Sequence, residues 1–131
     1  MPGQGTRPLG ADTLFTMEIK NVATELAAHP EGSFLDIVPF NGGHIGACSI
    51  TGVSPVWEMH PDTDEWFYIL EGEFEMTLLN GETSQHFIVE AGSTFVVPKG
   101  IWHKPGSPKG AKFMYLTPGQ TLHSDQEETL I

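Results

Sequence analysis

The sequence predicts an all-β fold, in the form of a sandwich or a barrel. From residue 33 to residue 117, short stretches rich in Phe, Ile, Val, Tyr and Trp are separated by Gly, Pro, Asn and Asp at intervals of roughly ten residues. Helical patterns are nearly absent, because only Asn21–Ala28 could form one or two turns before Pro30 and Gly32 end them. Strands in such a series close naturally into a sandwich or a barrel.

Eight strands are predicted from the positions of these turn and loop residues. Asn80-Gly81 is a hairpin signal, since both residues accept a positive φ, and Glu71-Gly72 and Ala91-Gly92 mark reversals or bulges. The predicted strands are Phe34–Val38, His44–Ile50, Val56–His60, Glu65–Leu70, Phe74–Leu79, Ser84–Val89, Thr94–Val97 and Lys112–Thr117.

A chain of 131 residues is long enough for one domain and too short for two of ordinary size. We divide it into an N-terminal extension with an edge strand (1–32), the barrel (33–117) and a polar C-terminal tail (118–131). The formal net charge of -11 would repel phosphate backbones and anionic lipid surfaces, so we expect neither nucleic acid nor membrane as a partner. The absence of a secretory signal favours a cytoplasmic address. Cys48, the single cysteine, is expected to be a buried packing residue.

Potential metal ligands occur in the stretch from Val56 to Glu65. The strand period of two places Glu58 and His60 on one face. Residues 61–64, Pro-Asp-Thr-Asp, have the composition of a tight turn, so Glu65 begins the next strand close beside His60. Carboxylates and an imidazole among apolar neighbours make a poor core, because a buried charge needs a partner or a metal.

A second stretch, Gly92–His103, passes through a Pro-Lys-Gly turn and ends at His103, which a barrel could return over the same interior. Together His60, Glu65 and His103 form a set of two histidines and one carboxylate. Such a set holds Fe(II), Mn(II), Zn(II) or Ni(II) and leaves positions open for a ligand.

These two stretches resemble the two motifs of the cupin superfamily. The first motif, His-x-His, three or four residues, Glu, six residues, Gly, is matched from Glu58 to Gly72. The second, Gly, five residues, Pro-x-Gly, two residues, His, is matched from Gly92 to His103. The resemblance implies a double-stranded β-helix, or jelly-roll barrel, with a divalent metal ion in its mouth held by Glu58, His60, Glu65 and His103.

Two positions depart from the family pattern. Glu58 stands where the first motif has a histidine, and Ser107 stands where an asparagine commonly follows the second motif. Two roles for Glu58 remain open: it is either a direct metal ligand or a catalytic residue that orients a metal-bound water or accepts a proton.

Structural alternatives also remain open for these residues. His60 and His103 could be internal histidines satisfied by hydrogen bonds, Glu65 a solvated carboxylate at a hairpin end, and Asp64 a ligand in its place. Four further histidines are weaker candidates: His29 and His123 are expected in solvent, and His44 and His86 each could line the cavity.

The resemblance implies a metal-binding protein with a small-molecule substrate or ligand. We expect a dioxygenase-type enzyme, and a non-catalytic binding protein or a metal-assisted isomerase or epimerase remains the alternative. A homodimer is also expected, because the apolar residues of the segment Leu14–Ile19 are arranged to add a strand to a neighbouring sheet. The same segment could instead fold onto its own barrel.

Overall fold

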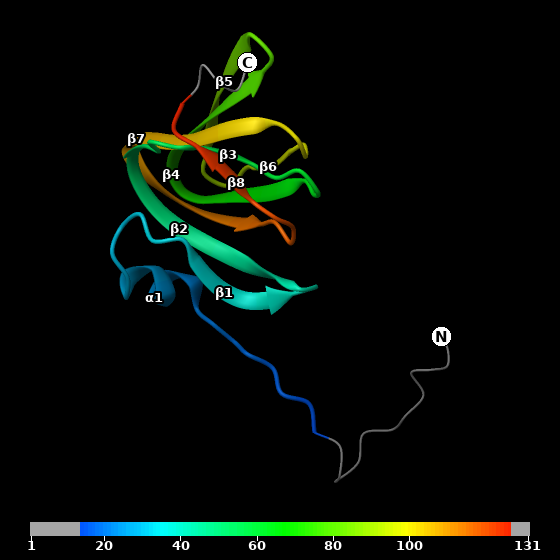
Figure 1. Ribbon diagram of the computed structural model, residues 1–131. Helices are drawn as coiled ribbons and strands as arrows, with labels where there is room; N and C mark the ends of the chain where they lie inside the picture. Colours follow the sequence, from blue (N-terminus) through cyan, green and yellow to red (C-terminus); the bar gives the residue numbers. More distant parts are fainter. Residues whose placement is uncertain (1–13, 127–131) are drawn as a thin grey trace.

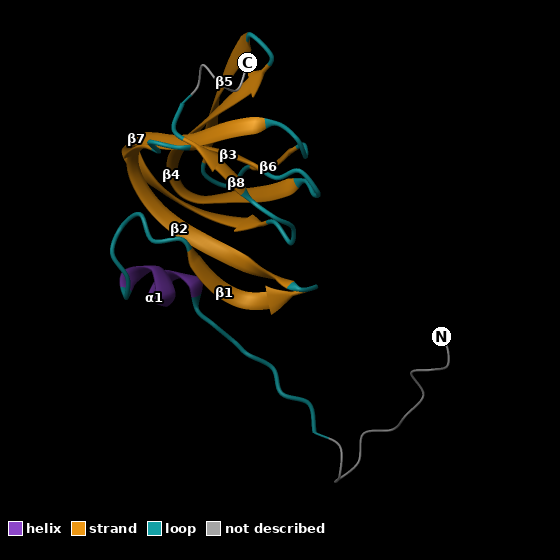
Figure 2. Ribbon diagram, viewed as in Figure 1, coloured by secondary structure: helices purple, strands orange, loops and turns teal. Residues whose placement is uncertain are grey.

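A computed structural model describes residues 14–126 and shows a curled antiparallel sheet with one short helix (Figure 1). Strands make up nearly all of the regular structure (Figure 2). In chain order, the elements are α1 (Val22–Ala27), β1 (Leu35–Phe40), β2 (Gly43–Val53), β3 (Trp57–Met59), β4 (Glu65–Asn80), β5 (Thr83–Glu90), β6 (Thr94–Val97), β7 (Trp102–Leu116) and β8 (Leu122–Ser124). The all-β prediction is confirmed.

The two longest strands, β4 and β7, form the centre of the sheet. They pair with each other along most of their length, and the other strands add to them: β2 and β3 pair with β7, whereas β5 and β6 pair with β4. β1 and β8 extend the sheet beyond β2 and β3. This arrangement is a jelly-roll barrel, in which one end of β3, β4 and β7 meets at the same mouth.

The barrel encloses an aromatic core. Its largest fully buried side chains include Phe74 and Phe113, whose ring centroids lie 4.9 Å apart. Phe67 stacks on Phe95 at 5.0 Å with nearly parallel planes. Cys48 lies in the same cluster and is fully buried, as the sequence predicted. The core therefore fills the barrel below its mouth and fixes the strands that carry the site.

Helix α1 covers the outside of the sheet next to β1. Asn21 caps it, since the Asn21 side chain accepts a hydrogen bond from the Thr24 backbone N–H at 2.9 Å. Leu26 packs against Ile37 of β1 and Ala47 of β2. The helix has six residues, far too few to cross a membrane. Residues 14–126 contain no other helix. Before α1, residues 14–21 form neither helix nor strand and lead away from the barrel (Figure 1).

Strand β4 is continuous where the sequence predicted two strands, Glu65–Leu70 and Phe74–Leu79. The break expected at Glu71-Gly72 is a bulge, at which the pairing with β7 shifts register. Gly72 has φ +81°, and a Cβ at this position would collide with the backbone of Gly110 on β7. The chain therefore bends here without ending the strand, because glycine allows both the positive φ and the close approach.

Strand β7 begins ten residues earlier than the predicted Lys112–Thr117. Its first part contains Pro105, Gly106, Pro108 and Gly110, residues that normally interrupt strands. The barrel tolerates them because the Pro105 carbonyl still accepts a hydrogen bond from the Ser54 N–H at 3.0 Å. Ser107 is fully buried, and its hydroxyl donates to the Glu73 carbonyl at 2.6 Å. Ser107 thus ties β7 to β4.

Candidate metal centre

Three strands and one turn bring the four predicted ligands together at the barrel mouth. Glu58 is the middle residue of β3, His60 directly follows that strand, Glu65 is the first residue of β4, and His103 is the second residue of β7. β3 and β7 pair antiparallel with Glu58 opposite His103. The alternation that places Glu58 and His60 on one face therefore directs both side chains toward His103.

The two motif stretches are joined by hydrogen bonds between their turns. The Gly100 N–H donates to the His60 carbonyl at 2.9 Å, and the Lys99 N–H donates to the Asp64 carboxylate at 2.9 Å. Asp64 is exposed, and it is not one of the four residues that cluster. The interpretation of Asp64 as the ligand in place of Glu65 is therefore wrong, and Asp64 instead anchors the turn that precedes β7.

Glu65 lies between the two histidines. Its Oε1 atom is 2.9 Å from Nε2 of His60 and 3.0 Å from Nε2 of His103. Oε1 of Glu58 is 4.0 Å from Nε2 of His103. One ligand atom from each of the four residues lies within 4.8 Å of all the others. His60, Glu65 and His103 are buried, so the interpretation of Glu65 as a solvated hairpin carboxylate is also wrong.

The hydrogen bonds of the imidazoles fit a metal ion. The His103 Nδ1–H donates to the Ile101 carbonyl at 3.0 Å, because a carbonyl can only accept. In the neutral ring, Nε2 then carries a lone pair, and this lone pair faces the carboxylate of Glu65. A nitrogen lone pair and a carboxylate oxygen 3.0 Å apart need a proton or a metal cation between them. The donor set, two imidazole nitrogens and two carboxylates, suits a divalent first-row metal.

The pKa values of the buried pair His60 and Glu65 are shifted so that each group favours its charged form. Burial lowers the pKa of His60, but the hydrogen bond to Glu65 and the charges of Glu65 and Glu58 outweigh it, so the pKa of His60 is raised above its ordinary value. Burial raises the pKa of Glu65, yet the hydrogen bonds from His103 and His60 outweigh burial and lower it. The site therefore keeps Glu65 as the carboxylate, the form that binds a metal.

Two further residues of the site come from the C-terminal segment, for which the sequence predicts a polar tail. The Thr121 hydroxyl lies 3.0 Å from Nδ1 of His60. Nε2 of His123 lies 3.3 Å from Oε2 of Glu58, although the His123 side chain is 56% exposed. β8 pairs with β3 and places His123 opposite Glu58. The sequence carried no signal for this contact, since the segment has no apolar alternation or motif.

The remaining histidines lie outside the cluster. His29 lies just after α1, and its Nδ1 atom is 2.9 Å from the Glu25 carbonyl oxygen of that helix. His44 and His86 are about half exposed and do not line the cavity beside the four ligands, so the interpretation of either as a cavity residue is wrong.

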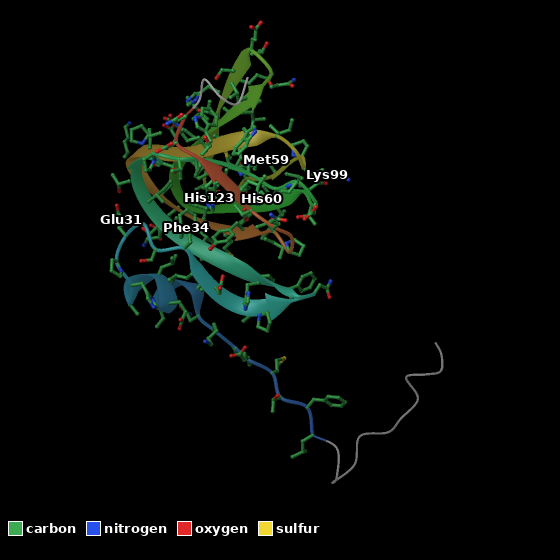
Figure 3. The ribbon with its side chains drawn as sticks, in the orientation of Figure 1. Glu31, Phe34, Met59, His60, Lys99 and His123 are labelled. Carbon is green, nitrogen blue, oxygen red and sulfur yellow. The ribbon has the colours of Figure 1, made fainter. Side chains whose placement is uncertain are left out.

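A cavity of about 260 Å³ opens beside the four clustered residues. Its wall includes four aromatic side chains, Phe34, Phe67, Phe113 and Tyr115. Figure 3 shows how Phe34, His60 and His123, which line the same cavity, come from three separate parts of the chain. Ligand sites in proteins are usually concave and mostly apolar with a few polar groups. The arrangement therefore combines a cluster that could hold a metal ion with room for a small molecule.

Known proteins resemble this chain over the same region. A protein-family profile described as Cupin domain matches residues 50–119. The protein YdbB of Bacillus subtilis (strain 168), described as uncharacterized, is 37% identical over 51 residues, which are 39% of this chain and 42% of YdbB. The chain thus spans less than half the length of this curated relative.

Solved structures share the fold. A cupin-2 domain protein from Shewanella frigidimarina NCIMB 400 is 28% identical with a TM-score of 0.67, over 76% of this chain and 94% of that chain. Hydroquinone 1,2-dioxygenase from Sphingomonas sp. TTNP3 has 13% identity and a TM-score of 0.65, over 83% and 81%. A variant of oxalate decarboxylase from Bacillus subtilis has 20% identity and a TM-score of 0.52, over 60% and 22%. The last two are similar in fold alone.

Proposed function

Since the chain belongs to the cupin domain family, we propose that it is a divalent-metal-dependent enzyme of the dioxygenase type, acting on a small organic substrate in the barrel mouth. The observation that carries this proposal is the convergence of Glu58, His60, Glu65 and His103 beside an aromatic-walled cavity. A set of two histidines and one carboxylate with open positions is typical of non-haem iron oxygenases. Proteins of this fold catalyse different reactions, so the fold does not identify the reaction. The proposed reaction therefore rests on the residues of the site.

The cofactor in this proposal is Fe(II) or Mn(II), because Glu58 adds a second hard oxygen donor to the set; Zn(II) and Ni(II) are the alternatives. When bound, the cation supplies a Lewis acid with positions open to the substrate. Nε2 of His60, Nε2 of His103 and a carboxylate oxygen of Glu65 would hold it.

The other residues of the mouth would position the substrate and move protons. Glu58 is only partly buried, so its carboxylate can reach a substrate hydroxyl in the cavity and accept its proton. Thr121 would hold the His60 ring in place through Nδ1. The rings of Phe67 and Phe113 keep water away from the inner wall.

Metal content of the purified protein tests the first part of the proposal. Protein prepared without chelators and without a metal-affinity column should contain about one equivalent of a divalent metal, because four donors form one site. His60→Ala and His103→Ala should each lose most of it. His86→Ala is the matched control, because His86 lies outside the cavity. A full equivalent retained in both site variants would show that the metal binds elsewhere.

Oxygen consumption tests the second part. The Fe(II)-loaded protein should consume oxygen with at least one member of a panel of β-diketones, catechols and thiols, and His103→Ala should abolish the uptake. If no member is consumed while the metal stays bound, the dioxygenase assignment fails and the protein is a metal-binding or isomerising cupin.

A further inference from the structure

From the charges around the cavity we infer that the substrate is an uncharged, single-ring compound with hydroxyl groups, of the phenol or catechol class, and not a carboxylate or a phosphate ester. This inference rests on the proposed function and narrows it to one substrate class. Three features of the cavity carry it: its charge, its wall and its size.

Among residues 14–126, no lysine or arginine side chain lines the cavity to pair with an anionic substrate. Residues 14–126 contain five lysines, and none of them lines the cavity: Lys20, Lys99, Lys104, Lys109 and Lys112. Lys99 lies on the loop after β6, away from Phe34 and His123 (Figure 3). Lys104 is held over the Trp57 ring, 4.6 Å from its centroid. Enzymes that bind carboxylates or phosphates commonly supply an arginine or a lysine for the charge, and the described wall supplies none.

When a metal ion is bound, the His60 imidazole is neutral, and the side-chain charges that line the cavity are then those of two carboxylates. Glu58 and Glu65 are both carboxylates, and together they would cancel the charge of a divalent cation. The imidazole of His123 is paired with Glu58 at 3.3 Å. The chain as a whole carries a formal charge of -11, which repels anions at long range. A carboxylate on the substrate would therefore lose its hydration without gaining a counter-charge.

The wall and the size of the cavity fit one aromatic ring. Phe34 is 52% exposed and lies edge-on to Phe113 and Tyr115, at centroid distances of 6.5 and 5.8 Å. An aromatic side chain held half-exposed over a cavity can cover a bound ring, because aromatic pairs gain energy in edge and offset geometries. The volume of about 260 Å³ lies below the roughly 300–1,000 Å³ of sites for drug-sized ligands.

Two catechol probes that differ at one ring position test this inference by calorimetry. Both contain the same catechol ring, but 4-methylcatechol carries a methyl group at the position where 3,4-dihydroxybenzoate carries a carboxylate. With the metal-loaded protein, without oxygen and near neutral pH, 4-methylcatechol should bind at least about tenfold more tightly, the equivalent of a modest charge penalty of roughly 1.4 kcal/mol. Phe34→Ala should weaken its binding by about tenfold. Phe40→Ala is the matched control, since Phe40 is similarly exposed but does not line this cavity.

A charge added to the wall provides the reverse test. Thr117 lines the cavity, so Thr117→Lys should reduce or reverse the preference for 4-methylcatechol, whereas the uncharged Thr117→Met should not. Equal or tighter binding of 3,4-dihydroxybenzoate by the unmodified protein would overturn the inference, as would binding of neither probe by protein that contains metal. Failure of the proposed function is distinct, since it shows as a protein that takes up no cation, or as metal-loaded protein that binds 4-methylcatechol but consumes no oxygen with it.

Discussion

Glu58 is the residue at which the candidate site departs from the family motif, and its two carboxylate oxygens face different partners. Oε1 lies 4.0 Å from Nε2 of His103, and Oε2 lies 3.3 Å from Nε2 of His123. This geometry allows Glu58 to complete the cluster directly. We predict that Glu58→Gln weakens metal binding several-fold or more, because it removes the charge and keeps the shape, while Glu58→His preserves binding by restoring the motif.

Metal affinity measured by competition with a chromogenic chelator distinguishes the two roles of Glu58. Unchanged affinity in the Gln variant, together with altered turnover, would assign Glu58 to proton transfer instead of ligation. The control is Glu75→Gln, since Glu75 pairs with His86 on the exposed hairpin of β4 and β5.

Cys48 illustrates how burial determines reactivity. Burial, with smaller contributions from the charges of Glu58 and Glu31, raises the pKa of the Cys48 thiol to about 12. The thiolate is the reactive form, so Cys48 should be inert toward Ellman's reagent in the folded protein at pH 8 and react fully in denaturant. Reaction of the native protein at the denatured rate would contradict both the burial and the raised pKa.

At the scale of elements, β8 links the C-terminal segment to the candidate metal centre. Thr121 precedes this strand and orients His60 through Nδ1. Residues that orient a metal-bound histidine typically contribute about 10- to 100-fold to metal affinity. We predict a loss of that size for Thr121→Val, which removes the hydroxyl at constant shape, and near-complete recovery for Thr121→Ser. An unchanged affinity in the Val variant would mean that the ring is held by packing alone.

The elements also show which parts of the structure a sequence can reveal. The closeness of His60 and Glu65 was predictable, because strand alternation and turn composition fix it locally, whereas His103 was placed beside them by the resemblance of its stretch to the second cupin motif. The first half of β7 was not, because Pro105 and Pro108 are compatible with a strand only where neighbouring strands make no demand on their missing N–H groups. Thr121 and His123 were missed for a related reason: their place depends on pairing with β3, and nothing in a short polar segment encodes that partner.

At the scale of the whole molecule, the N-terminal segment 14–20 presents an apolar face that no other part of residues 21–126 covers. Phe15, Met17 and Ile19 alternate with polar residues, the pattern of a half-buried strand, yet they are 78%, 80% and 80% exposed. We propose that this segment adds a strand to the sheet of a second copy, forming a homodimer. Light scattering should then give about twice the 14.3 kDa mass of the chain.

A charge on this face should disrupt the dimer. We predict that Met17→Asp yields monomers at micromolar concentration, because it buries an unpaired carboxylate in the added strand. Leu14→Asp is the matched control, because alternation places Leu14 on the opposite face although it is equally exposed. A strict monomer in the unmodified protein would refute the proposal.

The pairing of β8 with β3 sets the order in which a growing chain can complete its site. Ribosomes synthesise from the N-terminus at about 5–20 residues per second, so roughly 60 residues separate the emergence of His60 from that of Thr121 by about 3 to 12 seconds. During that interval β3 lacks its outer neighbour, and the His60 ring lacks its hydroxyl partner. The candidate site therefore reaches its described geometry only after residues 121–124 have been made, and a nascent chain stalled before residue 121 should bind a divalent metal ion more weakly than the full 131-residue chain.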